Sequence, residues 1–170
     1  MSGPMALSRR QAGTALLAAT GLGAAAAAAS PVNADDMRAR FRRYIALFNA
    51  GDPEALVPFF APSVELYLPR GPLIGPQAIV DYYRGSFGFL TEWLRIDTLI
   101  VDGNGLAAEL YTRFTAKRDH PGFKAMPLRA GDVYVVTTFV LYDFDEAGRF
   151  SRIRPAMWQR DLSGVRSREG

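Results

Sequence analysis

Tyr44 is the side chain whose type and setting best fit a role in chemistry. It lies in segment 35–50, where apolar residues recur at three- and four-residue spacing, the pattern of an amphipathic helix (Met37, Phe41, Tyr44, Ile45, Phe48). A tyrosine hydroxyl in an apolar site can donate a hydrogen bond to a substrate oxygen as negative charge develops there. The alternative is a core aromatic ring whose hydroxyl bonds a backbone group.

Segment 117–131 holds the candidates for moving a proton. Residues 117–123 read KRDHPGF and include His120, the single histidine of the chain. Imidazole suits proton transfer near neutral pH, and Asp119 beside it could act as a carboxylate base. The alternative is a solvent-exposed turn, because Asp, Pro and Gly favour turns for local reasons. Four further carboxylates could act as bases but have no distinguishing context: Glu65, Asp81, Glu92 and Asp97.

The last predicted strand, 149–158, carries Arg154 and Trp158. If Trp158 and Ala156 face the interior, strand alternation turns Arg154 inward too, where its guanidinium could orient an acidic substituent of a substrate. The alternative is a surface arginine on a strand bulged beside Pro155. With these catalytic candidates we expect a substrate-binding set of Tyr67, Tyr83, Phe87, Thr138 and Trp158.

Three helices and five strands would position these residues. The helices are expected over 35–50, over 52–60, and from Pro76 at a first helical position to about Phe87. Alternation and turn residues predict strands over 63–68, 94–101, 106–116, 133–144 and 149–158. This order predicts an α+β fold in which about three helices cover one face of a curved antiparallel sheet.

The first 34 residues are set apart from this domain. A basic pair, Arg9-Arg10, precedes an Ala-rich run that ends in Val32-Asn33-Ala34, which is typical of an export signal of the twin-arginine type. Cleavage is expected after Ala34 or, alternatively, after Ala29. We therefore expect a signal over 1–34, a domain over 35–160 and a disordered tail over 161–170, in a periplasmic or secreted protein without a stable membrane anchor after cleavage.

Composition excludes several kinds of site. Removing the signal leaves 18 basic and 17 acidic residues, a charge too small for a nucleic-acid partner. The chain has no cysteine and one histidine, so we expect no metal and no cofactor. Strand 133–141 is apolar on both alternating faces, which predicts a homodimer through Val133, Val135, Phe139 and Leu141.

Four short motifs extend across the proposed domain. They are RYIALFNAGD at 43–52, APSVEL at 61–66, GPQAI at 75–79 and FDEAGRF at 144–150. Together they resemble the nuclear transport factor 2-like superfamily, and within it the SnoaL-like and ketosteroid-isomerase-like branches. The resemblance implies a cone-shaped, strongly curved antiparallel sheet around one apolar pocket, usually dimerised through the outer sheet face.

The resemblance also carries residue roles. It implies that Tyr44 is an oxyanion-hole tyrosine, that Tyr83 supports its hydrogen-bond network, and that segment 117–131 closes the pocket mouth. Leu66 and Val140 stand where the isomerase has its two catalytic aspartates. Leucine cannot shuttle a proton and valine cannot donate a hydrogen bond, so that steroid isomerase mechanism is not expected.

These observations favour a small exported enzyme without a cofactor. It would act by proton transfer on an apolar cyclic or aromatic molecule, as an isomerase, dehydratase or other lyase. Tyr44 would bind the oxyanion, Arg154 would orient the substrate, and Asp119 or His120 would move the proton. One alternative is a non-catalytic periplasmic module that binds a small molecule with the same fold. Another is a dimeric accessory subunit that docks a second protein on its sheet face.

Overall fold

The computed structural model describes residues 33–102, 105–123 and 126–165. The expected signal, apart from its last two residues, lies outside these ranges. The elements are α1 (Ala34–Asn49), a 3₁₀ helix η1 (Glu54–Phe59), β1 (Phe60–Leu68), β2 (Gly71–Ile74), α2 (Pro76–Phe87), β3 (Leu90–Asp102), β4 (Gly105–Ala116), β5 (Val133–Phe144) and β6 (Phe150–Asp161). All the predicted elements are present; β2 is a strand that the sequence pattern did not predict.

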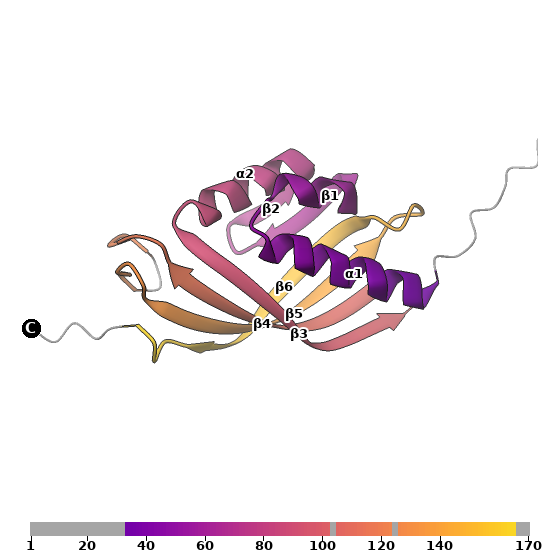
Figure 1. The fold of residues 1–170 in the computed structure, drawn as a ribbon. Coiled ribbons are helices and arrows are strands. Elements are labelled where there is room, and N and C mark those ends of the chain that lie inside the picture. Colours follow the sequence, from indigo (N-terminus) through magenta and orange to yellow (C-terminus); the bar gives the residue numbers. More distant parts are fainter. Residues whose placement is uncertain (1–32, 103–104, 124–125, 166–170) are drawn as a thin grey trace, which may run out of the picture.

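The six strands form one curved, unclosed sheet in the order β2-β1-β6-β5-β4-β3. Strands β3 to β6 form an antiparallel meander, while β1 runs parallel to β6 and antiparallel to β2. Figure 1 shows both α-helices on the same side of the bent sheet. The α+β fold with a cone-shaped sheet and about three covering helices is confirmed.

Helix α1 buries the apolar stripe that the sequence predicted, including Tyr44 and Phe48. The helix begins one residue before the expected 35–50, with Asn33 as the N-cap, and the Asn33 side chain accepts a hydrogen bond from the Asp35 N–H. A cap of this kind satisfies a backbone donor that has no partner inside the helix.

A glycine and a proline begin α2. Gly75 has φ of 85°, a left-handed conformation that glycine adopts without steric cost, and its N–H donates to the Val64 carbonyl at 2.7 Å. Pro76 follows in the first helical turn, where a missing N–H costs nothing. This turn ties the start of α2 to β1 and so directs Tyr83 toward the sheet.

The main core lies between α1 and the sheet and is rich in aromatic rings. Phe41 and Phe150 are fully buried at its centre, and the Tyr44 ring meets Phe150 edge to face at a centroid distance of 5.0 Å. Such edge-to-face pairs contribute about 0.5–1.5 kcal/mol beyond the burial of their area. A second, smaller cluster around Leu128 and Tyr134 packs beneath the loop between β4 and β5.

The C-terminal end is ordered further than expected. Strand β6 continues to Asp161, Leu162 and Val165 pack against the smaller cluster, and the Val133 N–H donates to the Gly164 carbonyl at 3.1 Å. Residues 161–165 thus belong to the packed domain, which corrects the expected start of the tail. Among the described residues, no helix is long and apolar enough to cross a membrane.

Candidate active site

An interior pocket of about 310 Å³ opens between the helices and the concave face of the sheet. Hydrocarbon and phenyl side chains make up most of its wall: Phe48, Leu66, Leu68, Pro69, Leu94, Leu110, Phe114, Val140, Ile153, Pro155 and Met157. Its polar lining consists of four tyrosines, two threonines and one glutamate: Tyr44, Tyr82, Tyr83, Tyr142, Thr112, Thr138 and Glu92. A mostly apolar cavity with a few converging polar groups is the usual form of a small-molecule site.

Three tyrosines meet at this pocket. Tyr44 comes from α1, Tyr83 from α2 and Tyr142 from β5, and the Tyr44 and Tyr142 ring centroids lie 6.4 Å apart. Burial raises the pKa of Tyr44 well above its usual range, and a hydrogen bond with the Tyr83 hydroxyl partly opposes this rise. Burial also raises the pKa of Tyr83 and of Tyr142. All three phenols therefore stay protonated near neutral pH and can serve as hydrogen-bond donors.

Glu92 lines the same pocket from the start of β3. Its side chain is half-buried because it borders the cavity, and its carboxylate accepts a hydrogen bond from the Ser86 hydroxyl of α2. Burial raises the pKa of Glu92, and the Ser86 hydrogen bond opposes that rise. Among the described residues, Glu92 is the one carboxyl group in the lining, and no Lys, Arg or His lines the pocket.

Asn49 fixes the distance between the helix that carries Tyr44 and the strand that carries Glu92. Its amide Nδ2 donates to the Leu94 carbonyl at 2.8 Å, and the Leu94 N–H donates to Asn49 Oδ1 at 2.7 Å. This pair links the last residue of α1 to the backbone of β3, the edge strand of the sheet. It couples the two sides of the pocket through partly buried hydrogen bonds.

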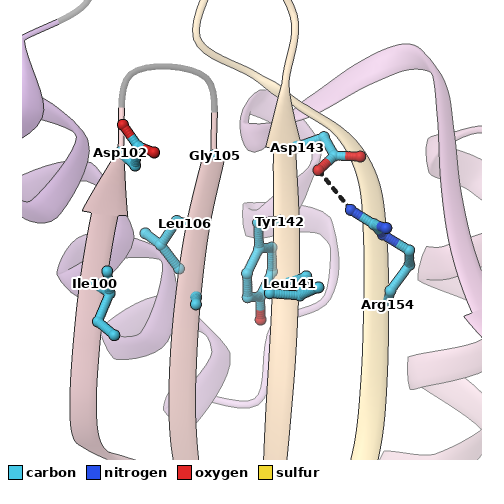
Figure 2. A pocket seen from close by; sticks show the side chains of 9 residues that line it. Ile100, Asp102, Gly105, Leu106, Leu141, Tyr142, Asp143 and Arg154 are labelled. Atoms are coloured by element: carbon cyan, nitrogen blue, oxygen red, sulfur yellow. Dashed lines mark hydrogen bonds and ion pairs between the residues drawn. The ribbon is translucent and has the colours of Figure 1, made fainter.

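A second hollow, of about 450 Å³, lies on the outer face of the sheet. Figure 2 shows Arg154 pointing toward Asp143, and their Nη2 and Oδ1 atoms are 2.7 Å apart. Ile100 and Leu141 line the same hollow. Two carboxylates line it, Asp102 and Asp143, and the second of them is already paired with arginine. The interior pocket is therefore the better candidate for chemistry, because it brings several groups with shifted pKa together.

The family comparison agrees with this architecture. The model of the SnoaL-like domain matches residues 41–153. The chain belongs to the SnoaL-like family. The matched segment runs from α1 to β6 and includes every polar residue that lines the interior pocket.

Solved structures similar to this SnoaL-like protein are distant in sequence. A candidate polyketide cyclase from Xanthomonas campestris pv. campestris is 22% identical, with a TM-score of 0.63 over 72% of this chain and 90% of that one. A SnoaL-like polyketide cyclase from Agrobacterium tumefaciens str. C58 is 21% identical, with a TM-score of 0.60 over 75% and 92%. The epoxide hydrolase/cyclase-like enzyme SalBIII, described for pyran ring formation in the polyether salinomycin, is 13% identical, with a TM-score of 0.62 over 75% and 96%. These likenesses establish the fold. No curated protein matches the sequence.

Three of the sequence-predicted site residues line the interior pocket of the SnoaL-like domain. They are Tyr44, Tyr83 and Thr138. Phe87 lies one layer behind, where its ring packs on Phe48 at 5.3 Å.

Arg154, Trp158 and Tyr67 lie on the outer face instead, so the expected inward orientation of the first two is wrong. Trp158 is 65% exposed and packs its ring against Phe139 at 6.1 Å. The β5–β6 register shifts by one residue between Thr137 and Thr138 and again between Asp143 and Phe144. Between these two shifts the inward positions of β6 are 153, 155 and 157, and Arg154 faces out. Tyr67 is exposed, and its hydroxyl donates to Glu65 at 2.7 Å.

Asp119 and His120 do not line the pocket either. Asp119 is exposed and accepts from the Ala130 N–H at 2.9 Å, which is a loop-closing contact. His120 packs its ring against Phe89 at 4.7 Å and pairs its backbone with Leu128. Figure 1 shows this loop between β4 and β5 at the end of the sheet away from the start of α1.

Glu92 lines the pocket, although the sequence pattern did not distinguish it from three other carboxylates. The predicted strand began at Leu94, whereas β3 begins at Leu90. Within 90–94 burial alternates, with Leu90 and Leu94 inside and Thr91 and Trp93 exposed. Starting the strand four residues earlier would have placed Glu92 on the buried face. Within the described part of the chain, no three His, Asp or Glu side chains group in a way that could hold a metal ion.

Proposed function

We propose that this SnoaL-like protein is a cofactor-free enzyme that acts by proton transfer on an apolar cyclic or aromatic small molecule. The reaction class would be isomerisation, dehydration or another lyase step. Tyr44, assisted by Tyr83 and Tyr142, would donate hydrogen bonds to the oxygen on which charge develops.

The observation that carries this proposal is the cluster of buried phenol groups at an apolar pocket. Donors that are already oriented in a dry site stabilise a developing oxyanion far better than donors in water do, because no solvent has to reorganise. Tyr44 is 2% exposed, Tyr83 lines the same pocket, and aromatic rings surround Tyr44. The enzymatic descriptions of the SnoaL-like cyclase and of SalBIII support the same class of activity.

A second candidate is a non-catalytic module that binds a small molecule. Leu66 and Val140 favour it, since both side chains line the pocket at positions where the isomerase has catalytic aspartates. Both residues extend the apolar wall, which suits tight binding of a hydrocarbon surface.

Substitution of Tyr44 tests the first candidate against the second. A panel of aromatic ketones, alcohols and phenylpropanoid-like dimers is offered to the parent protein and to Tyr44→Phe. The ring stays, so the fold should survive, while turnover should fall about a hundredfold if the hydroxyl is an oxyanion donor. Tyr67→Phe is the matched control, because its hydroxyl bonds Glu65 on the outer face. Asp119→Asn and His120→Ala should also turn over like the parent.

Two results would decide against catalysis in this pocket. The first is turnover by Tyr44→Phe at the parent rate. The second is thermal stabilisation by members of the panel with no product formed by the parent, which would establish the binding module instead.

We also propose export through the signal over 1–34 and a homodimer through the outer sheet face. The signal pattern supports the first. The exposed rings and aliphatic side chains on one sheet face support the second, since Phe139 and Leu141 are 45% and 47% exposed. The protein would then work in the periplasm or outside the cell.

A further inference from the structure

We infer that Glu92 is the residue that moves the proton in the interior pocket, and that the Ser86 hydroxyl is its positioning residue. This inference rests on the proposed function, since it assigns the proton-transfer step of the same site.

The position of Glu92 is the first argument. A group that abstracts a proton must lie within hydrogen-bond reach of the substrate, and Glu92 is the one carboxyl group that lines the pocket among the described residues. Asp119 and His120 lie in the loop between β4 and β5, outside the pocket lining. Geometry therefore selects Glu92 before any question of its acidity.

The contact with Ser86 is the second argument. Ser86 lies in the last turn of α2, six residues before Glu92, and its Oγ donates to Glu92 Oε1. One carboxylate oxygen is therefore held, while among the described residues no side chain bonds the other oxygen, Oε2. A carboxylate held on one side and open on the other is oriented for reaction with a bound molecule.

The surroundings of Glu92 are the third argument. Tyrosines from two helices line the same pocket as Glu92: Tyr44 on α1, and Tyr82 and Tyr83 on α2. Each of these tyrosines has its pKa raised by burial and, to a smaller extent, by the charge of Glu92. No basic side chain is among the causes that shift the pKa of Glu92. Burial raises that pKa, so the carboxylate is a stronger base than an exposed one and its acid form is available to return the proton.

The proton-transfer step balances without any further reactant. Glu92 as carboxylate takes a proton from the carbon next to a carbonyl group. The electron pair of that C–H bond becomes the C=C bond of an enolate, and the negative charge moves to the oxygen that Tyr44 contacts. Glu92, now protonated, returns the proton to a different carbon in isomerisation, or to a departing hydroxyl group in dehydration.

The same arrangement specifies an uncharged substrate. An anionic substituent would enter a pocket that holds a carboxylate and, within the described residues, no cationic side chain in its lining. Burying an unpaired charge there is strongly unfavourable. The substrate class is therefore a neutral cyclic carbonyl compound, not the acidic molecule that an inward Arg154 would have required.

Exchange of a carbon-bound proton tests the assignment directly. The probe is 2-tetralone in D₂O, and NMR follows replacement of the hydrogens next to its carbonyl by deuterium. The parent protein should accelerate exchange, Glu92→Gln should lose this by about 10²- to 10⁴-fold, and Tyr44→Phe should lose it by about a hundredfold. Glu109→Gln is the matched control, because Glu109 accepts from Thr98 at 2.9 Å on the outer face.

The pH profile tests the positioning role of Ser86. The Ser86 hydrogen bond lowers the pKa of Glu92, so Ser86→Ala should move the rising limb of exchange rate against pH to higher pH. The pKa of Glu92 can also be read without substrate, from the titration of its carboxyl ¹³C signal, which is assigned by its absence in Glu92→Gln. That pKa should rise in Ser86→Ala as well. A merely structural role for Ser86 would change neither value.

The outcomes separate this inference from the proposed function. Loss of exchange in Tyr44→Phe with full exchange in Glu92→Gln would keep the proposed function and overturn the role of Glu92. Full exchange in both variants would overturn the assignment of the reaction to this pocket. A parent protein that does not accelerate exchange overturns both.

Discussion

Protonation of single side chains decides what the pocket can do. Tyr44 and Glu92 both have a raised pKa because burial disfavours their charged forms, but the consequences are opposite. The phenol stays a donor throughout the physiological range. The carboxyl group is brought closer to the range in which it can both accept and release a proton. One apolar environment thus prepares a donor and an acid–base group together.

Glu92 should also make stability depend on pH in a defined direction. Its folded pKa is raised, so its favourable contribution is complete below its unfolded pKa of about 4.3 and is lost as pH rises through the folded pKa. Glu92→Gln carries no such group. The midpoint of thermal unfolding of Glu92→Gln minus that of the parent should therefore increase from pH 4 to pH 8.

The control for that measurement is Glu109→Gln, whose difference from the parent should stay flat with pH. A flat difference for Glu92→Gln as well would mean that Glu92 is well solvated in the folded protein, contrary to its place in the pocket lining.

Helix α1 and strand β3 are the elements whose relative position matters most. They carry Tyr44 and Glu92 on facing sides of the pocket, and Asn49 ties them through two hydrogen bonds to Leu94. Side chains that satisfy two backbone groups at once act as fixed spacers, because a shift of either element breaks both bonds. Residue Glu92 is only two positions from that anchor.

Asn49→Ala should therefore lower the stability of the folded protein by more than the loss of one small side chain would. It leaves a partly buried N–H and C=O of Leu94 without their partners, which should lower the free energy of unfolding by about 1–3 kcal/mol. Urea unfolding followed by tryptophan fluorescence measures this. Gln159→Ala, an exposed residue on β6, should leave the unfolding midpoint unchanged.

The turnover rate of Asn49→Ala is a second measure of how far Asn49 aligns α1 with β3. A rate loss in Asn49→Ala at temperatures where the variant is fully folded would support alignment of the two sides of the pocket. Parent-like stability and rate together would show that packing alone holds α1 on β3.

The outer face of the sheet bears on the oligomeric state of the whole molecule. Large apolar side chains that are 45–65% exposed lie on β5 (Phe139 and Leu141), on the adjacent β6 (Trp158) and on β3 (Ile100), where Ala107 of β4 lies between Ile100 and Leu141. Val133 and Val135, expected in the same interface, are half-buried. A contiguous apolar surface of this kind is seldom left in water, and an isologous dimer would cover it in both copies.

Phe139→Asp should break that dimer. Light scattering at micromolar concentration should give about twice the mass of the monomer for the parent and the monomer mass for the variant, because a charge would have to be buried in the interface. Val57→Asp is the control, since Val57 is an exposed apolar residue on η1, away from the sheet face. A monomeric parent would rule the interface out.

Export concerns the whole chain as well. The secreted form should begin at Asp35 or at Ser30, as N-terminal sequencing of an extracytoplasmic fraction would detect. Cleavage at Ser30 would keep Asn33, whose cap on α1 is worth about 1 kcal/mol, while cleavage after Ala34 would remove it.

Changing Arg9 and Arg10 to Lys should stop export by the twin-arginine route. Unchanged export of that variant would indicate the general secretory route, and recovery of Met1 in the exported protein would contradict a cleaved signal.

Local patterns in the sequence were sufficient for the elements and much of the fold. The three- and four-residue spacing in α1, the Gly75-Pro76 start of α2 and the alternation in β5 are short-range signals, because each depends on neighbours within one or two turns. The family resemblance then predicted the cone-shaped sheet and the inward orientation of Tyr44 and Tyr83.

The remaining site depended on how strands align with one another. Two register shifts in the β5–β6 ladder, at Thr137/Thr138 and at Asp143/Phe144, decide that Arg154 and Trp158 face outward, because a one-residue shift exchanges the two faces of a strand. Glu92 lies in the pocket lining because β3 begins at Leu90 and because α2 places Ser86 beside it. Both facts are set by contacts between segments distant along the chain or by pairing across the sheet. Composition and local spacing do not contain that information, so only the tertiary structure could decide which side chains share the pocket.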